Sequence, residues 1–333
     1  MNDVMQAVQF PAARQIHVTT VADPVPAADE VVVTVRAAAL NHRDLWIKLG
    51  QYAGLKYPCI PGSDGAGVVA ADSADGTFKA GDEVIIYPGY DWGDNPRAQA
   101  STFSILGLPR DGTLAQKIAV PTKQLAPKPV HLTWTEAAAL PLAGLTAYRA
   151  LFARSHLRTG EKVLITGIGG GVALFALQFA VADGAEVWVT SSSEAKIAQA
   201  VALGAKSGFN YTTDGWAEAA ATEIGGADVI VDSAGGAGFA SLVDIAKPGG
   251  RIVFFGATRG DPDVLPARKV FWKQLSILGT TMGNADDWAA MLAFTAEHQI
   301  KPVVSDTFAV ADAPAAFDLM EQGGQFGKIV VTM

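Results

Sequence analysis

The sequence predicts an α/β protein in which a doubly wound, parallel-sheet domain is joined to a second, mainly β domain. From about residue 135 to 283, β-forming runs alternate with helical stretches, and repeated βα units give a parallel sheet covered by helices on both faces. The β-forming runs are KVLITG, EVWVTS, DVIVDS, RIVFFG and SILGTT. The sequence of residues 1 to about 125 instead predicts short strands bounded by Gly, Pro or Asp, which indicates a barrel-like all-β region. A length of 333 residues suits two domains.

The tail of the sequence returns to β character. It contains VVSDTFAV, then a short helical segment PAAFDLMEQ, and then the apolar run KIVVTM. A last strand of this kind could rejoin the first domain.

Composition excludes several classes of protein. The chain has 33 acidic and 25 basic side chains, a net charge of −8 and no basic run, which argues against nucleic acid as a partner. Cys59 is the only cysteine, so an internal disulfide and a four-thiolate zinc site are excluded, and a reducing compartment fits. The longest apolar run is broken by Gln178 and closed by Asp183, short of the roughly 18 residues that a membrane span requires. The start MNDVMQAVQF does not resemble a signal peptide. We therefore expect a soluble cytoplasmic protein with no membrane partner.

The stretch VLITGIGGGVALFALQFA, residues 163–180, places four glycines in five positions between a β-forming and a helix-forming run. Such a loop lets backbone N–H groups approach a diphosphate at the helix N-terminus, where the helix dipole favours anions. A tight connection alone would also explain one glycine-rich turn, but the further βα units favour a dinucleotide site. The predicted cofactor-binding residues are Gly167, Gly169, Gly170 and Gly171, followed by the small Val172 and Ala173.

The turn after the second predicted strand favours NADPH over NADH. An NAD site usually has an acid at the carboxyl end of that strand, about 20 residues after the glycines, to hold the ribose 2′-hydroxyl. Thr190 and Ser191 stand there instead, and Glu194 is spaced as a capping-box partner of Ser191. Ser191, Ser192 and Lys196 on one turn offer a place for a 2′-phosphate, which an acid would repel. The alternative for Lys196 is a solvated lysine on the helix surface.

With these motifs in place, the chain resembles the medium-chain dehydrogenase/reductase superfamily over almost its full length. The matching stretches are ALNHRDLWIKLGQY, PCIPGSDGAGVV, AGDEV, LPLAGLTAY, the glycine loop, NYTT, DSAGG, PGGRIVFFGAT and KQLSILGTTMG. It looks most like the quinone-oxidoreductase branch and its zinc-type alcohol dehydrogenase-like relatives. The resemblance implies a GroES-like catalytic domain over residues 1–126 and 284–333, a Rossmann domain over 127–283, and an active site in the cleft between them.

The sequence departs from the alcohol-oxidising members of this family at the catalytic zinc. Asn41, Ser63 and Leu142 stand where those members have two cysteines and a histidine, and a catalytic zinc needs about three N, S or carboxylate ligands. Residues 87–112 match the structural zinc lobe but contain no cysteine, so this segment is a lid, a subunit contact or a plain surface loop. We expect no metal, although His42, Cys59 and Asp64 could in principle converge on one.

The resemblance also implies roles for individual residues. Asn41, His42 and Asp44 are expected beside the nicotinamide ribose, with capping of a helix as the alternative for Asp44. Tyr52 is expected at the pocket wall, as a proton donor or as an aromatic gate. The residues expected to face the nicotinamide are Thr146, Phe255, Gly256, Ala257, Gly279 and Thr280, and Tyr211 and Lys328 are weaker candidates for the adenosine phosphate.

These expectations favour an NADPH-dependent, zinc-independent reductase of quinones or α,β-unsaturated carbonyls, with Asn41, Asp44 and Tyr52 as its catalytic residues. A zinc-dependent alcohol dehydrogenase with unusual ligands and a non-catalytic NADPH-binding protein remain as alternatives. Family members pair the last strand of the nucleotide domain across a two-fold axis, and the uncharged edge near residues 275–282 favours such a homodimer here. The alternative is a monomer in which Lys273 and the following helix cover this edge.

Overall fold

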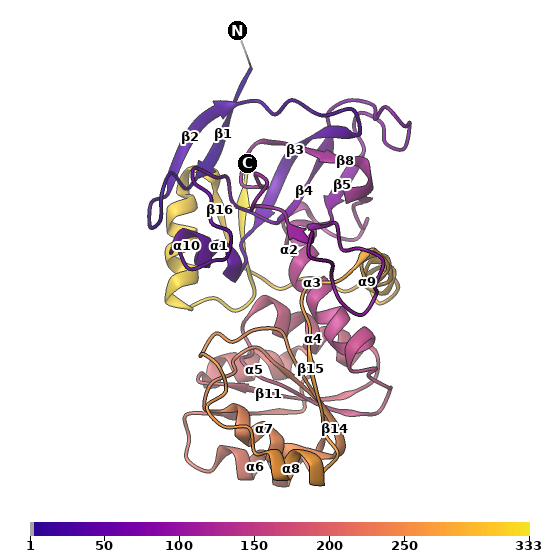
Figure 1. Cartoon of the computed structure of the whole chain (residues 1–333), viewed down its shortest axis with the longest axis vertical. Helices are drawn as coiled ribbons and strands as arrows, with labels where there is room; N and C mark the ends of the chain where they lie inside the picture. Colours follow the sequence, from indigo (N-terminus) through magenta and orange to yellow (C-terminus); the bar gives the residue numbers. More distant parts are fainter. Residues whose placement is uncertain (1–2) are drawn as a thin grey trace. The chain divides into compact units, whose positions relative to one another are not determined.

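A computed structural model describes residues 3–333 of the chain and divides it into two compact units (Figure 1). Unit 1 comprises Met1–Ala143 with Asn284–Met333, and unit 2 comprises Gly144–Gly283. The second boundary is the one expected from the sequence. The first lies later than the expected 126/127, because helix α2 (Trp134–Ala139) packs through buried Ala137, Ala138 and Ala139 against the sheet of unit 1.

Unit 2 is built on a six-stranded sheet in which all neighbouring strands are parallel, so the predicted doubly wound fold is confirmed. The order across the sheet is β12-β11-β10-β13-β14-β15, and its direction of progression reverses between β10 and β13. The strands are β10 (Lys162–Ile165), β11 (Glu186–Ser191), β12 (Ser207–Asn210), β13 (Ala227–Asp232), β14 (Ala246–Phe254) and β15 (Ser276–Gly279). Ligands of such sheets bind at the carboxyl ends of the strands, beside the reversal point.

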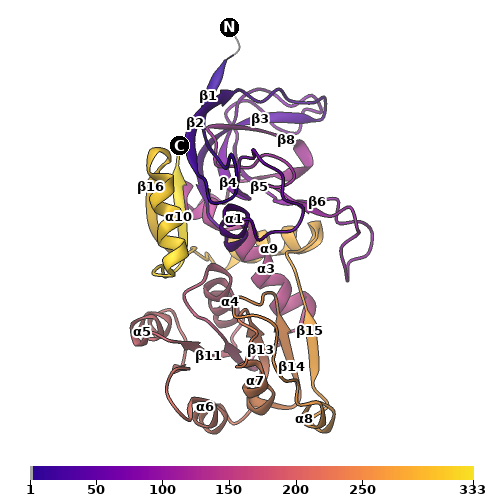
Figure 2. The same cartoon turned by 60° about the vertical axis from the view of Figure 1, so that its left-hand side comes forward.

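Helices cover the two faces of this sheet, with α4 and α5 on one side and α6, α7 and α8 on the other (Figure 2). Alternate side chains of each strand point to opposite faces of the sheet and pack against the helices there. On one face, Leu164, Ile230 and Ile252 are buried in a core cluster with Phe239 and Leu242 of α7. The helices are α4 (Gly171–Ala182), α5 (Glu194–Ala202), α6 (Trp216–Ile224), α7 (Phe239–Ile245) and α8 (Ala267–Trp272), preceded by α3 (Pro141–Tyr148) and a π-helical turn at Arg149–Arg154.

Unit 1 is mainly β. Its seven-stranded sheet has the order β16-β17-β3-β4-β5-β9, and β8 also pairs with β3. The chain end rejoins this unit, because β17 pairs antiparallel with β3 through Val330, Val331 and Thr332. The strands are β3 (Glu30–Ala39), β4 (Asp64–Val69), β5 (Glu83–Ile86), β8 (Lys117–Pro121), β9 (Leu125–Pro127), β16 (Val304–Ala309) and β17 (Lys328–Thr332), with separate pairs β1 (Val4–Gln9) with β2 (His17–Ala22) and β6 (Gly89–Tyr90) with β7 (Ser104–Ile105).

Three further helices pack on unit 1: α1 (His42–Lys48), α9 (Ala285–Glu297) and α10 (Ala313–Gln322). The core between α1 and α10 is apolar and includes Leu40, Ile47 and Leu114. Within it, the rings of Phe10 and Phe317 meet edge to face, with centroids 5.3 Å apart. This core fixes α1, which carries several of the predicted site residues.

The 87–112 segment is held by aromatic and charged contacts. The Trp92 ring packs on Phe103 with centroids 5.1 Å apart, and the Arg110 guanidinium lies 4.5 Å from the ring centroid of Tyr90 and 3.7 Å from Asp91 Oδ2. Tyr90 and Trp92 are buried, whereas Asp91 and residues 93–99 are exposed, so this part of the segment is a surface loop anchored on unit 1 by two rings.

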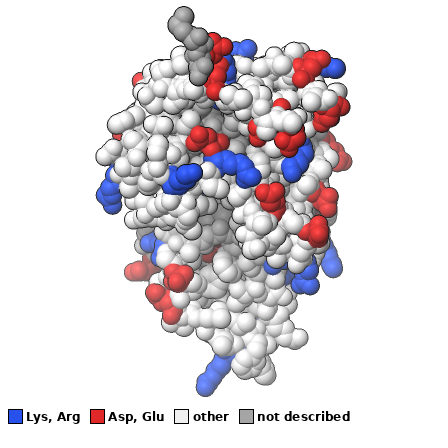
Figure 3. All heavy atoms as spheres, turned by 45° about the horizontal axis from the view of Figure 1, so that its top comes forward, with Lys and Arg blue, Asp and Glu red and all other residues white. Residues whose placement is uncertain are grey.

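The surface mixes both signs of charge. On the face in Figure 3, Lys and Arg are interspersed with Asp and Glu, without an extended basic area among the described residues. Within residues 3–333, none of the helices combines the length and the apolar character that crossing a membrane requires.

Candidate functional site

The glycine loop of unit 2 connects β10 to the N-terminus of α4, and Gly170 is the N-cap of that helix. Gly167 has φ +64° and Gly169 has φ +123°, backbone conformations that residues with a side chain rarely adopt. A Cβ on Gly169 would lie 3.0 Å from Lys196 Cδ and 3.4 Å from Lys196 Nζ. The first N–H groups of α4 therefore lie beside a loop of glycines that has no side chains to block a ligand. The Lys196 side chain, from α5, lies over this loop.

The reversal point of the sheet is fixed by Thr166 and Asp232, at the ends of β10 and β13. Thr166 Oγ1 donates to Asp232 Oδ1 at 2.5 Å, and Asp232 Oδ2 accepts from the Gly235 N–H at 2.9 Å. Both side chains are buried. Because Asp232 accepts these bonds within the protein, it shapes the loop after β13 instead of facing a ribose.

The carboxyl end of β11 carries the residues expected at the adenosine. Ser191 ends the strand, and its carbonyl oxygen accepts from the Tyr211 N–H at 3.1 Å, so Tyr211 lies beside it. The capping-box interpretation of Glu194 is wrong: Ser193 is the N-cap of α5, and Glu194 Oε1 accepts from Asn210 Nδ2 at 2.9 Å. Partial burial lowers the pKa of Lys196.

The residues expected near the nicotinamide lie at the carboxyl ends of β14 and β15, apart from Thr146, which is buried in α3. Phe255, Gly256 and Ala257 follow β14, and the Phe255 N–H donates to the Asp232 carbonyl oxygen at 3.1 Å. Gly279 ends β15, and Thr280 Oγ1 is buried without a hydrogen-bond partner in the described part of the chain. An unsatisfied buried hydroxyl is a position where a polar ligand atom would be accommodated.

In unit 1, Asn41, Asp64 and Lys328 form a buried network. Lys328 Nζ donates to Asn41 Oδ1 at 2.6 Å and to Asp64 Oδ2 at 2.9 Å, and Asn41 Nδ2 donates to Asp64 Oδ2 at 2.9 Å. Asp64 Oδ1 accepts from the Leu142 N–H at 2.8 Å. The side chains of Lys328 and Asp64 are 4% and 0% exposed, so the ion pair is shielded from water.

This network bears on two expectations. The Lys328 ammonium donates to Asn41 and Asp64 inside unit 1, and these bonds take the place of the expected contact with the adenosine phosphate. Asn41, Ser63 and Leu142 offer an amide, a hydroxyl and an alkyl group, and the carboxylate beside them already faces an ammonium, so these residues do not fit a zinc ion. Within residues 3–333, no group of three His, Cys, Asp or Glu side chains could hold a metal ion. Burial also raises the pKa of the Cys59 thiol to about 11.

Asp44 is completely buried and organises the start of α1. Its Oδ2 accepts from the Asn41 N–H at 2.9 Å, and its Oδ1 accepts from the Gly62 N–H at 3.2 Å. Burial raises the pKa of Asp44, an effect that the positive charge of Arg43 opposes. These contacts make Asp44 a positioning residue of the helix N-terminus, in agreement with the capping alternative.

Arg43 is a site residue that the sequence reasoning missed. It is buried, and its Nη1 donates to Ser63 Oγ at 2.7 Å and to the Leu106 carbonyl oxygen at 2.6 Å. Its Nε lies 3.4 Å from Tyr52 Oη, and its guanidinium carbon is 5.1 Å from the Tyr52 ring centroid. One feature of the sequence could have identified Arg43 as a buried residue. It lies four residues before Ile47, and this spacing places both side chains on the core face of α1.

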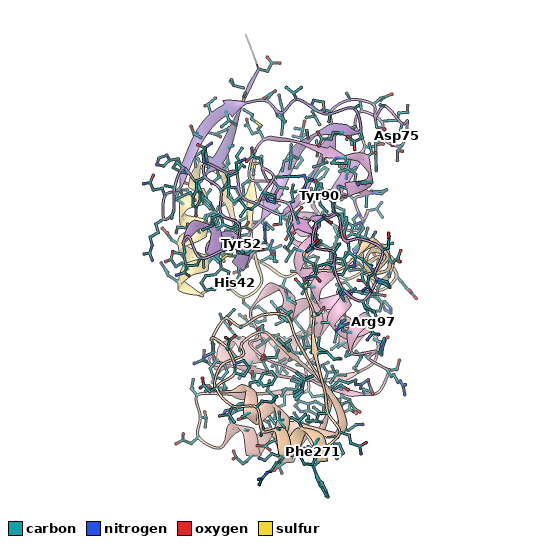
Figure 4. All side chains as sticks on the ribbon, in the orientation of Figure 1. His42, Tyr52, Asp75, Tyr90, Arg97 and Phe271 are labelled. Carbon is teal, nitrogen blue, oxygen red and sulfur yellow. The ribbon has the colours of Figure 1, made fainter. Side chains whose placement is uncertain are left out.

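His42 is the first residue of α1, and its side chain retains exposure to solvent. Burial of the ring by surrounding atoms and the positive charge of Lys328 lower the pKa of His42. Figure 4 labels His42 and Tyr52, both in unit 1, and Arg43, the residue after His42, contacts the Tyr52 ring. The structure thus brings Asn41, His42, Asp44 and Tyr52 together in unit 1.

A glycine loop at the reversal point of a parallel six-stranded sheet, joined to a β unit built from both chain ends, defines the class of two-domain nicotinamide-dependent oxidoreductases. The chain belongs to the medium-chain dehydrogenase/reductase superfamily. Residues 27–130 match the alcohol dehydrogenase GroES-like domain, and residues 171–297 match the zinc-binding dehydrogenase domain. It is an NAD(P)-dependent oxidoreductase.

Three relatives illustrate this membership. The zinc-type alcohol dehydrogenase-like protein YogA of Leptosphaeria maculans is 36% identical over 95% of this chain and 94% of its own length. The acryloyl-coenzyme A reductase of Metallosphaera sedula is 32% identical over 98% of this chain and 100% of its own. The crystal structure of an NAD-dependent alcohol dehydrogenase superposes with a TM-score of 0.93, at 37% identity, over 99% of this chain and 100% of that one.

Proposed function

We propose that this oxidoreductase is NADPH-dependent and zinc-independent, and that it transfers hydride to a quinone or an α,β-unsaturated carbonyl compound. The observation that carries the proposal is the Lys328 ammonium bonded to Asn41 and Asp64. Asn41 stands where alcohol-oxidising relatives would have a zinc ligand, and Asp64 directly follows Ser63, which stands at a second such position. An ammonium beside the carboxylate repels a second cation and satisfies the charge that a metal would otherwise balance.

The absence of suitable zinc ligands among these residues favours reduction of a carbonyl compound over oxidation of an alcohol. Alcohol oxidation must stabilise a developing alkoxide, which zinc does as a Lewis acid. A quinone or enone is already electrophilic, so its reduction mainly requires orientation and a hydrogen-bond donor to the carbonyl oxygen. NADPH, when bound, would supply the hydride.

Tyr52 is the proposed donor. Arg43 Nε faces the phenol oxygen at 3.4 Å as a donor, so the phenol's own O–H is left to donate elsewhere. Asn41 is fixed by Lys328 and Asp64, and Asp44 by two backbone N–H groups, so we assign both to positioning. These bonds hold the N-terminus of α1 in one arrangement.

The preference for NADPH rests on the carboxyl end of β11. Ser191, Ser192, Lys196 and Tyr211 gather there, and the acid that would hold a ribose 2′-hydroxyl is absent from that position. The glycine loop and the N-terminus of α4 would hold the diphosphate.

A panel of quinones and α,β-unsaturated ketones or thioesters with NADPH tests the function, together with metal analysis of the purified protein. We expect oxidation of NADPH with at least one acceptor and no loss of activity on chelation. One tightly held zinc per chain, lost together with activity, would favour the second candidate, a zinc-dependent alcohol dehydrogenase. The zinc-binding dehydrogenase match and the NAD-dependent alcohol dehydrogenase structure favour that candidate. No turnover with any acceptor would favour a non-catalytic NADPH-binding protein.

We further propose that the protein is a cytoplasmic homodimer formed through the edge of the unit 2 sheet. The edge strand β15 pairs with β14, and no second strand of the described chain pairs with its other side. Open N–H and C=O groups on such an edge favour pairing with another copy.

A further inference from the structure

We infer that Arg259 is a second cation of the site for the adenosine 2′-phosphate, acting with Lys196 from the opposite side. The inference rests on the proposed preference for NADPH and extends it to a residue far away in the sequence. Arg259 lies in the 255–266 segment that follows β14, and its side chain is exposed.

The backbone around Arg259 is anchored to the loop that follows β13. The Arg259 N–H donates to the Ala234 carbonyl oxygen at 2.9 Å, and the Gly236 N–H donates to the Gly260 carbonyl oxygen at 2.8 Å. The approach is close enough to require glycine, since Gly236 has φ +59° and a Cβ there would lie 2.8 Å from the Arg259 carbonyl oxygen. The position of Arg259 is therefore set by two loops at the carboxyl edge of the sheet.

From this anchor the Arg259 side chain reaches Tyr211. Its guanidinium carbon is 5.2 Å from the Tyr211 ring centroid, a cation–π contact. Tyr211 follows β12, which β11, β10 and β13 separate from β14 in the sheet. The contact exists because the 255–266 segment runs across the carboxyl ends of those strands (Figure 1).

Tyr211 links Arg259 to the turn where a 2′-phosphate is expected. The Tyr211 N–H donates to the Ser191 carbonyl oxygen at 3.1 Å, so the residue on which the guanidinium stacks lies beside the end of β11. Lys196 lies on α5, the helix that follows this turn, and its Nζ is 3.4 Å from the Cβ position of Gly169 in the glycine loop. Lys196 follows the end of β11 on α5, and Arg259 stacks on the tyrosine bonded to that end, so we infer that both cations serve one phosphate in a chain with a net charge of −8.

The chemistry of a 2′-phosphate suits this pair. A phosphate monoester carries close to two negative charges at neutral pH, and a planar guanidinium can bind two of its oxygens. Within residues 3–333, Arg259 takes part in none of the ion pairs and its guanidinium stacks on Tyr211 in an exposed segment that also carries Asp261 and Asp263, so its N–H donors are available to a phosphate. NADH lacks the phosphate and gains nothing from either cation.

Fluorescence titration of the full chain with NADPH and with NADH tests the inference. We expect Arg259→Ala to weaken NADPH binding about 10-fold or more and NADH binding less than about twofold, and Arg259→Lys to recover part of the loss. Arg268→Ala, which removes an exposed arginine from α8, is the matched control and should change neither affinity. Equal losses for both cofactors, or no loss for NADPH, would overturn the role of Arg259.

Lys196→Ala separates this inference from the proposed cofactor preference. A selective loss of NADPH in Lys196→Ala but not in Arg259→Ala refutes Arg259 alone. If the wild type binds NADH at least as tightly as NADPH and neither variant is selective, the NADPH proposal itself fails.

Discussion

Lys328 Nζ lies 2.9 Å from Asp64 Oδ2, and the two side chains are 4% and 0% exposed. The pair joins the last strand of the chain, β17, to the start of β4, and Asn41 bridges both partners. A buried ion pair adds little net stability over apolar residues, but removing one partner leaves an uncompensated charge in the interior.

Replacing one partner of this pair should therefore be costly. Lys328→Met is expected to lower the free energy of unfolding by about 3–5 kcal/mol, because it leaves Asp64 buried and unpaired. The double variant Lys328→Met/Asp64→Asn should recover part of that loss. Urea denaturation measures the free energy of unfolding of the single and the double variant.

Lys48→Met is the matched control for that experiment. Lys48 is a buried lysine of α1, but its partners Asp318 and Glu321 are largely exposed, so the loss should stay near 1 kcal/mol. Equal losses in the two lysine variants would argue against an uncompensated charge.

Arg43 and Tyr52 should act as a unit in turnover. If Tyr52 donates a proton, Tyr52→Phe lowers kcat with an enone by about 10²- to 10⁴-fold. Arg43→Lys keeps the charge but loses the planar fork that reaches Ser63, Leu106 and the phenol, and should lower kcat less.

The coupling distinguishes a functional pair from separate structural effects. In the Tyr52→Phe background, Arg43→Lys should cause little further loss of kcat, because Arg43 affects turnover by positioning the Tyr52 hydroxyl, which that background lacks. Independent, multiplying losses, or a Tyr52→Phe variant altered only in KM, would instead support an aromatic gate.

Much of the fold was predictable because its signals are local. The five apolar strand runs of unit 2 became β10, β11, β13, β14 and β15, and the tail strand became β17. The sequence reasoning missed β12, whose residues SGFN include Gly and Asn, weak strand formers. Only its pairing with β11 identifies it as a strand.

The candidate site was less predictable because its contacts are long-range. The glycine loop is one continuous segment, but Lys328 meets Asn41 across almost the whole chain, and Arg259 meets Tyr211 across the sheet. No spacing rule connects such residues. The sequence therefore predicts a contact with the adenosine phosphate for Lys328, which the structure bonds to Asp64, and it does not single out Arg43, which lies between two predicted site residues and bonds to Ser63.

The titration of His42 should report on the charge of Lys328. Burial and that charge lower the pKa of His42 from its ordinary value of 6.5, so the unfolded chain binds the proton more readily than the folded one. His42 therefore costs stability as the pH falls from 6.5 through its folded pKa, and costs nothing well above 6.5.

NMR titration of the histidine ring protons, assigned with His42→Gln, measures this pKa. Lys328→Met should move it upward toward 6.5 but not fully, since burial is the larger cause. A pKa above 6.5 in the wild type, or one that Lys328→Met lowers, would contradict this electrostatic account.

The last prediction concerns assembly through β15. Lys273, which could have covered this edge, instead donates from Nζ to the carbonyl oxygens of Val243, Asp244 and Ala246 at the end of α7. Arg154 Nε donates to the Gly279 carbonyl oxygen at 3.0 Å, so the open part of the edge is Ser276–Leu278. Just before it, Phe271 and Trp272 of α8 are 67% and 83% exposed, and Figure 4 shows Phe271 at the surface of unit 2.

Light scattering at micromolar concentration should give twice the chain mass of 34.6 kDa. Ser276→Lys places a charge on an exposed position of the edge, where two-fold pairing would bring it near its own copy, and should shift the protein toward monomer. Ala219→Lys, on the exposed side of α6, adds the same charge away from the edge and should leave the dimer intact. A wild-type monomer with full activity, or a Ser276→Lys dimer as stable as that of Ala219→Lys, would refute pairing through β15.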